Sequence, residues 1–160
     1  MKVLKKLSYG EYVATAVKDS SEMTTRNKDY IAAGAINWIT QTSFEPPMVA
    51  MAVAIESDLQ ETIEKSRKFT LHLLAEGQEK LLKKFSETSD INEKTINGMP
   101  YERGKNGQVI LGDTLGYLIC EVEKSITSGD HTLYLAKVLE QVLLKDDAPL
   151  TTEKAGIQYA

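Results

Sequence analysis

Residues 31–56 read IAAGAINWITQTSFEPPMVAMAVAIE, in which two apolar stretches flank the break Phe44-Glu45-Pro46-Pro47. Proline cannot donate a hydrogen bond to a central strand ladder, so two prolines between apolar stretches favour a turn. We therefore expect two strands, residues 31–41 and 48–56, joined by a proline turn. A buried helix is the alternative for so short an apolar stretch, because periodicity does not distinguish the two.

The second of these strands has one bulky face and one small face. Val49, Met51, Val53 and Ile55 point one way, and the alanines between them point the other way, because successive side chains of a strand alternate. The bulky face is suited to fill a barrel interior. The alanine face lets another layer approach closely, either a helix or a second subunit.

A helix is expected directly after this strand. Ser57 and Gln60 have the spacing of a capping box, in which the serine hydroxyl accepts from an otherwise unpaired amide and the glutamine reaches back. Leu59, Ile63 and the stem of Arg67 give this helix a narrow apolar stripe.

The middle of the chain contains a strand, a second helix and a polar excursion. Residues 69–74 alternate as a strand, and residues 78–85 form an amphipathic helix with Leu81, Leu82 and Phe85 on one side. Residues 87–106 are polar and have no sustained period, so we expect an excursion with short elements.

Three β-rich segments follow, at residues 109–111, 115–125 and 132–144. The last two flank Thr127-Ser128-Gly129-Asp130, which has the composition of a hairpin turn. Many strands with few helices favour a mainly β fold, a closed or partly open antiparallel barrel, over a doubly wound sheet.

Length and composition indicate one globular domain over residues 1–160, with 42% hydrophobic and 26% charged residues. A net charge of −4 and a pI near 5.3 lack the basic footprint of nucleic-acid binding. No signal peptide and no stretch of roughly 20 apolar residues is present. The single cysteine, Cys120, is expected to be a buried thiol. We therefore expect a cytoplasmic protein with no nucleic acid and no membrane as partner.

Several common site patterns are missing from the sequence. It has no Gly-rich dinucleotide fingerprint, phosphate loop or nucleophile elbow. The two histidines, His72 and His131, lack metal-ligand spacing with cysteine or with each other, so we expect no metal site.

The sequence resembles the flavin reductase-like domain family along almost its whole length. The resemblance rests on the stretch from Asn37 to Pro47, which is similar to N-W-x-x-Q-x-S-F-x-P-P, and on the order of four further motifs. These are YGEYVAT at residues 9–15, the strand at residues 69–74 followed by Gln78 and Phe85, GDHT at residues 129–132, and GIQY at residues 156–159.

This resemblance implies an FMN-binding split barrel of Greek-key type that forms a homodimer, with the flavin near the subunit interface. The isoalloxazine ring would lie along the strand and loop that contain Asn37, Trp38, Ile39, Thr40 and Ser43. Amides directed at the flavin would stabilise the negative charge that reduction places there. The alternative makes Asn37 and Thr40 ordinary strand-end residues and Trp38 a core residue.

The resemblance also suggests residues for the FMN phosphate. Ser57 and Thr62 lie in the first turns of a helix, where free amides and the helix dipole favour an anion. Lys84, or Lys83 beside it, would reach the same phosphate. The alternatives are that Ser57 only caps the helix and that both lysines lie on a solvated helix face.

His131 matches a histidine that lies near the nicotinamide in family reductases, and we expect it at the catalytic position. Its neutral ring would hydrogen-bond the nicotinamide amide or a flavin edge without transferring a proton. The alternative is a histidine that caps the hairpin turn. His72 stands where many relatives have asparagine, and we expect a core or interface histidine there.

The function implied by the resemblance is FMN-binding oxidoreductase chemistry. Reduced NADH or NADPH would give a hydride to FMN, or to FAD as the alternative flavin, and the electrons would pass to free flavin, ferric iron or another small acceptor. Two other hypotheses remain open. One is a flavoredoxin-like electron carrier that does not oxidise nicotinamide, and the other is an interaction domain without flavin.

Overall fold

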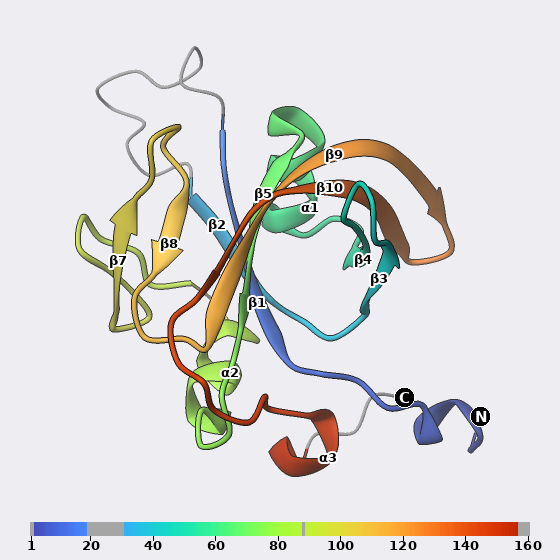
Figure 1. Cartoon of the computed structure of the whole chain (residues 1–160), viewed down its shortest axis with the longest axis horizontal. Coiled ribbons are helices and arrows are strands. Elements are labelled where there is room, and N and C mark those ends of the chain that lie inside the picture. Colours follow the sequence, from blue (N-terminus) through green and yellow to red (C-terminus); the bar gives the residue numbers. More distant parts are fainter. Residues whose placement is uncertain (1, 19–30, 88, 157–160) are drawn as a thin grey trace.

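The computed structural model describes residues 2–18, 31–87 and 89–156, and Figure 1 shows its arrangement. The part of the GIQY motif after Gly156 lies outside the described residues. The elements in chain order are η1 Leu4–Lys6, β1 Tyr12–Val17, β2 Ile31–Ile36, β3 Ile39–Ser43, β4 Met48–Ala54, α1 Asp58–Ser66, β5 Lys68–Leu73, α2 Glu79–Phe85, β6 Thr95–Ile96, β7 Met99–Arg103, β8 Val109–Leu111, β9 Gly116–Ser128, β10 His131–Leu143 and α3 Thr152–Ala155.

Seven strands form one antiparallel sheet in the order β2-β1-β5-β9-β10-β4-β3, and β6, β7 and β8 form a second, smaller sheet. The large sheet curls so that its two edge strands, β2 and β3, are joined by only Asn37 and Trp38. The amide of Ala52 on β4 donates to the carbonyl of Trp38 at 2.9 Å, which ties this link to the neighbouring strand. Asn37 and Trp38 thus form the seam of the barrel.

The prediction of a single strand over residues 31–41 was wrong, because the chain changes partner at the seam. Residues before Asn37 pair with β1, and residues after Trp38 pair with β4, near the opposite end of the strand order. No glycine or proline marks the change. The proline turn between β3 and β4 is confirmed.

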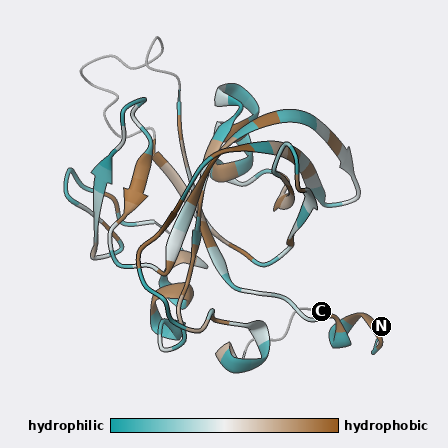
Figure 2. Ribbon diagram, viewed as in Figure 1, coloured by the Kyte–Doolittle hydropathy of each residue, from teal (hydrophilic) through white to brown (hydrophobic). Residues whose placement is uncertain are grey.

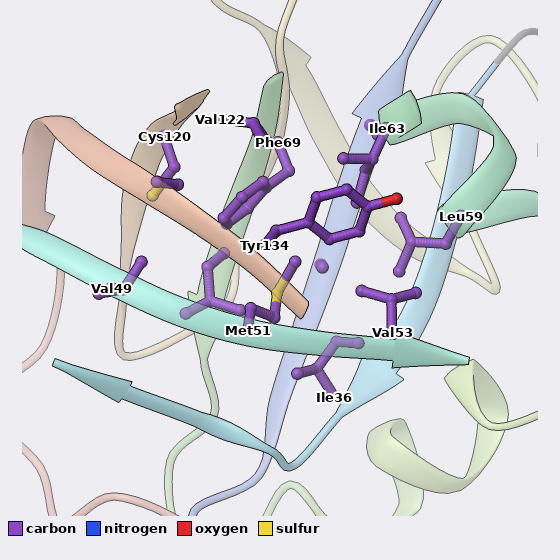
Figure 3. Packing of buried hydrophobic residues seen from close by; sticks show 14 of the residues in the cluster. Ile36, Val49, Met51, Val53, Leu59, Ile63, Phe69, Cys120, Val122 and Tyr134 are labelled. Atoms are coloured by element: carbon purple, nitrogen blue, oxygen red, sulfur yellow. The ribbon is translucent and has the colours of Figure 1, made fainter. Parts of the chain in front are cut away.

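The barrel core contains the bulky face of β4, as predicted. Val49, Met51 and Val53 are buried with Tyr134 of β10, and Figure 3 shows these side chains directed toward one another. Ile55 lies beyond the end of β4 and is partly exposed. α1 closes this core with its own buried residues, Leu59, Thr62 and Ile63.

The predicted capping of α1 is confirmed, since the hydroxyl of Ser57 accepts from the amide of Gln60 at 3.1 Å. The tyrosine of the core is tied to the same helix. Its hydroxyl donates to Glu64 Oε1 at 2.7 Å and to the Gln60 carbonyl at 3.3 Å. α1 is therefore fixed against the barrel by apolar packing and by partly buried hydrogen bonds.

A second apolar cluster covers the outer face of β1 and β2. It combines Leu82 and Phe85 of α2 with Ile96 and Leu111 of the smaller sheet. Figure 2 shows β8 as hydrophobic and β7 as largely hydrophilic, in keeping with β8 packing inward. The predicted excursion at residues 87–106 thus contains short strands that form an outer layer.

The outer layer explains why β5 departs from simple alternation. Phe69 and Leu71 belong to the barrel core, yet Thr70 and His72 are buried as well. His72 Nδ1 lies 2.9 Å from the carbonyl of Val13, and its Nε2 accepts from the amide of Leu111 at 3.0 Å. The histidine therefore joins the large sheet to β8, in agreement with its predicted core position.

The closing hairpin is longer than predicted. β9 and β10 extend to a two-residue turn at Gly129 and Asp130, and Gly129 has a φ of 78° that suits glycine. Within the described residues, no helix combines the length and the apolar character needed to cross a membrane.

Candidate functional site

The candidate site lies where the seam of the barrel meets the tip of the β9–β10 hairpin. The rings of Trp38 and His131 are in contact, with centroids 4.6 Å apart and planes inclined at 46°. The ring of Tyr9, from the segment before β1, lies 6.3 Å from that of Trp38. Three segments far apart in the sequence thus build one aromatic cluster.

His131 is oriented by its neighbour in the turn. Its Nδ1 lies 2.7 Å from Oδ1 of Asp130, and the hydrogen bond and charge of His131 hold the pKa of Asp130 below its usual value. A carboxylate accepts only, so Nδ1 carries the hydrogen in this contact. In the neutral ring, Nε2 is then left as a hydrogen-bond acceptor.

Two hydrogen-bond donors at the seam are buried and unsatisfied. Asn37 Nδ2 and Trp38 Nε1 have no hydrogen-bond partner anywhere in the described part of the chain. A buried donor without a partner costs about 1–3 kcal/mol, so such groups in a native protein call for an explanation. Acceptor oxygens of a bound molecule would satisfy both, and the carbonyl groups of a flavin ring fit this requirement.

β3 adds backbone donors beside these side chains. It is an edge strand that pairs only with β4, so alternate amides point away from the sheet. Thr40 is exposed, and its hydroxyl donates weakly to the carbonyl of Gln41 at 3.3 Å. Ile39 and Ser43 are half-buried at the two ends of the strand. The predicted ring-binding residues therefore lie together along the seam and the edge.

The predicted phosphate residues at α1 have their hydroxyls engaged. Ser57 accepts from Gln60 and donates to the carbonyl of Ala54 at 2.7 Å. Thr62 is buried and donates to the carbonyl of Asp58 at 2.7 Å. Glu61 and Asp58 also place two carboxylates in the first turn. The capping role of Ser57 is confirmed, whereas a phosphate role for Ser57 and Thr62 stays a prediction.

Lys84 does not come together with Ser57 in a single chain. It is exposed on α2, whose buried residues belong to the outer cluster, whereas α1 packs in the barrel core. Figure 1 shows the two helices at different ends of the molecule. A contact of Lys84 with an FMN phosphate stays a prediction that this separation does not favour.

Sequence reasoning missed two residues of the cluster. Tyr9 was part of a family motif without an assigned role, and its contact with Trp38 depends on closure of the barrel. Asp130 was treated only as a turn residue, although its position next to His131 in GDHT was a signal for a pair.

Comparisons with known proteins concern the family and the fold of the chain. The family model of the flavin reductase like domain matches residues 4–158. Diflavin flavoprotein A 1 of Synechocystis sp. is 29% identical over 138 residues, which cover 86% of this chain and 22% of that protein. The chain spans less than a third of the length of the curated relatives that it matches.

Two solved structures share the fold. A flavin reductase domain protein from Arthrobacter sp. FB24 has a TM-score of 0.79 at 19% identity, over 94% of this chain and 86% of that chain. An NADH:FAD oxidoreductase from Streptomyces globisporus C-1027 has a TM-score of 0.77 at 20% identity, over 93% of this chain and 83% of that chain. At these identities the likeness concerns the fold, and it confirms the predicted split β-barrel.

Proposed function

Because the chain belongs to the flavin reductase-like domain family, we propose that it binds FMN and passes electrons from NADH or NADPH to a small acceptor, either free flavin or ferric iron. The observation that carries this proposal is the pair of buried, unsatisfied donors, Asn37 Nδ2 and Trp38 Nε1, beside the ring of His131. They supply hydrogen bonds where a flavin ring has acceptors.

The residues of the seam have distinct roles in this proposal. FMN, when bound, supplies a ring that accepts a hydride and releases electrons to the acceptor. Trp38 and Asn37 donate to ring oxygens, where preorganised donors stabilise the charge that develops on reduction. His131, held by Asp130, presents Nε2 as an acceptor for the carboxamide of the nicotinamide.

We further propose that a second copy of this chain completes the site. The alanine face of β4 is not covered by a helix in the described residues; Ala54 is exposed and Ala50 and Ala52 are half-buried. Leu133 pairs with Ala52 on one side and with Ile126 on the other, and both large side chains are exposed. Such an exposed apolar face supports burial against the same face of a second copy.

The second candidate function is an electron carrier that holds flavin but does not oxidise nicotinamide. The curated relatives are named diflavin flavoproteins, and this chain matches less than a third of their length. In such a context the domain would receive its electrons from another part of a longer chain.

Flavin binding and nicotinamide oxidation are separated by one set of measurements. The purified protein is titrated with FMN and with FAD by fluorescence, and NADH or NADPH is then added without oxygen while the flavin absorption is recorded. Loss of the absorption supports the reductase. Bound flavin that neither nucleotide bleaches supports the carrier, and absence of binding to either flavin contradicts both.

The seam is tested by Trp38→Phe, which keeps a ring and removes the Nε1 donor. We expect an FMN dissociation constant about tenfold higher, the equivalent of one buried hydrogen bond of about 1.4 kcal/mol. Tyr117→Phe is the matched control, because it removes one polar atom from a half-buried ring outside the cluster. Equal affinities of both variants and the wild type contradict the assignment of the ring site to the seam.

A further inference from the structure

A second hollow lies apart from the aromatic cluster, between the outer face of β1, β5 and β9 and the turn that joins β7 to β8. Its volume is about 600 Å³, within the range of roughly 300–1,000 Å³ usual for small-molecule pockets. Figure 1 shows the β7–β8 hairpin beside the large sheet, on the side away from β3 and β4. We call this hollow the hairpin cleft.

The hairpin cleft and the candidate flavin site are separated by the length of α1. Ser57 caps the first turn of this helix, and Ser66 at its last turn lines the cleft. A helix of nine residues is about 13 Å long. Trp38 and His131 do not line the cleft, so a ligand in it would not occupy the flavin site.

The cleft is basic although the chain carries a net charge of −4. Lys18, Lys68, Arg103 and Lys105 line it, and Glu121 is the single carboxylate among its lining residues. Neither Lys68 nor Lys105 takes part in an ion pair with any described residue. Clustered charges of one sign over a concave surface focus their field on a ligand of opposite sign.

The floor of the cleft holds a buried hydroxyl next to an apolar wall. Thr70 is only 2% exposed, and its hydroxyl makes no hydrogen bond within the described part of the chain. The neighbouring Thr15, by contrast, donates to the carbonyl of Val109 at 2.8 Å. Ile119 and Leu139 supply apolar surface beside them. The cleft therefore offers both a hydrogen-bond donor and a surface for an uncharged ligand body.

The turn between β7 and β8 and the side chain of Arg103 are held in place before any ligand arrives. The amide of Gly104 donates to the carbonyl of Gln108 at 2.8 Å, and the amide of Gly107 donates to the carbonyl of Gly104 at 3.0 Å. Arg103 Nη1 donates to the carbonyl of Gly107 at 3.0 Å, and its guanidinium lies over the ring of Tyr101. A cationic side chain fixed in this way loses little conformational freedom on binding.

We propose that the hairpin cleft binds a phosphorylated small molecule of mononucleotide size. The phosphate faces Lys68, Arg103 and Lys105, since lysine and guanidinium groups suit a phosphate dianion. The apolar body of the ligand lies against Ile119 and Leu139, which a bare phosphate ion would leave uncovered. The hydroxyl of Thr70 donates to the ligand.

The test uses AMP as the probe and protein incubated with an excess of riboflavin, which has the flavin ring but no phosphate, so that the seam is occupied while the phosphate position of the cleft stays free. We expect saturable binding of AMP by calorimetry, with adenosine at least about tenfold weaker because it lacks the charged hydrogen bonds. Amide shifts on AMP addition should centre on Thr70 and Val109 in NMR spectra. Absence of saturable AMP binding overturns the proposal, as does equally tight binding of adenosine.

Charge-matched variants locate the site. The double variant Lys68→Gln, Lys105→Gln should weaken AMP binding at least about tenfold, whereas Lys124→Gln, Lys137→Gln removes the same charge from exposed strand positions outside the cleft and should change it less than twofold. Equal effects of both pairs overturn the proposal. If the first double variant fails to fold, the single variant Lys105→Gln, at an exposed turn, replaces it, and it too should weaken AMP binding. Neither result depends on whether FMN itself binds.

Discussion

Acidification should destabilise this protein through His72. The ring is fully buried, its Nδ1–H donates to the carbonyl of Val13, and its Nε2 accepts from the amide of Leu111. A second proton, on Nε2, would therefore break the hydrogen bond with Leu111 and place a charge in the core. Burial lowers the pKa of His72 to about 4 from the value of 6.5 that is usual for histidine. Between these two values the unfolded chain binds a proton that the folded chain excludes, so stability falls as the pH falls.

The size of the effect follows from the two pKa values. With 1.36 kcal/mol for each pKa unit, the loss in the free energy of unfolding is about 2 kcal/mol between pH 7.5 and pH 5 and reaches about 3.4 kcal/mol well below pH 4. The stabilisation is thus fully present above pH 6.5 and is lost through the window between 6.5 and 4.

Urea unfolding at pH 7.5 and at pH 5, followed by the fluorescence of Trp38, measures this loss. His72→Asn removes the titrating ring and should shrink the pH-dependent difference by about 2 kcal/mol, while it lowers stability at pH 7.5 because the amide of Leu111 loses its acceptor. His131→Asn is the matched control, since His131 is half-exposed. An unchanged pH difference in His72→Asn would refute the reasoning.

Other substitutions probe the remaining features. Ser57→Ala should lower the free energy of unfolding by about 1 kcal/mol, since it removes the cap of α1; Ser66→Ala, at the other end of the helix, should cost less than half of this in the same urea titration. Thr40→Val should raise the FMN dissociation constant a few-fold, and unchanged fluorescence titrations would remove Thr40 from the site. His131→Ala should slow reduction by NADH at least about tenfold in stopped flow, yet change FMN affinity less than threefold. If the rate of reduction and the affinity for FMN fell by the same factor, His131 would be a flavin-binding residue only. Leu133→Asp should convert a dimer to monomers in sedimentation, and a wild type that sediments as a monomer contradicts the interface.

Local patterns predicted those parts of the fold that short-range physics determines. The alternation of Val49, Met51 and Val53, the cap at Ser57 and the glycine at the hairpin turn each reflect forces within a few residues. The break at the seam was not predictable in this way. Asn37 and Trp38 separate two strands because β2 pairs with β1 and β3 pairs with β4, and these two partners lie in opposite halves of the sheet order, which no local pattern around residue 37 reveals.

The candidate site shows the same division. The resemblance supplied Asn37, Trp38 and His131, but the contact between the Trp38 and His131 rings and the absence of partners for two donors follow only from the closed barrel. Lys84, whose phosphate contact stays a prediction, shows what a sequence pattern leaves out. Its distance along the chain gave no sign that α2 packs on the outer cluster while α1 packs in the core.

The seam gives ligand binding a mechanical consequence. Asn37 and Trp38 are the sole covalent bridge between the first and last strands of the large sheet, and they also carry the unsatisfied donors. A molecule that accepts hydrogen bonds from both donors would restrict the motion of β2 and β3 relative to each other at the seam of the barrel. Amide hydrogen exchange in β2 and β3 should therefore slow together when flavin is added, even though only β3 is proposed to lie along the flavin ring.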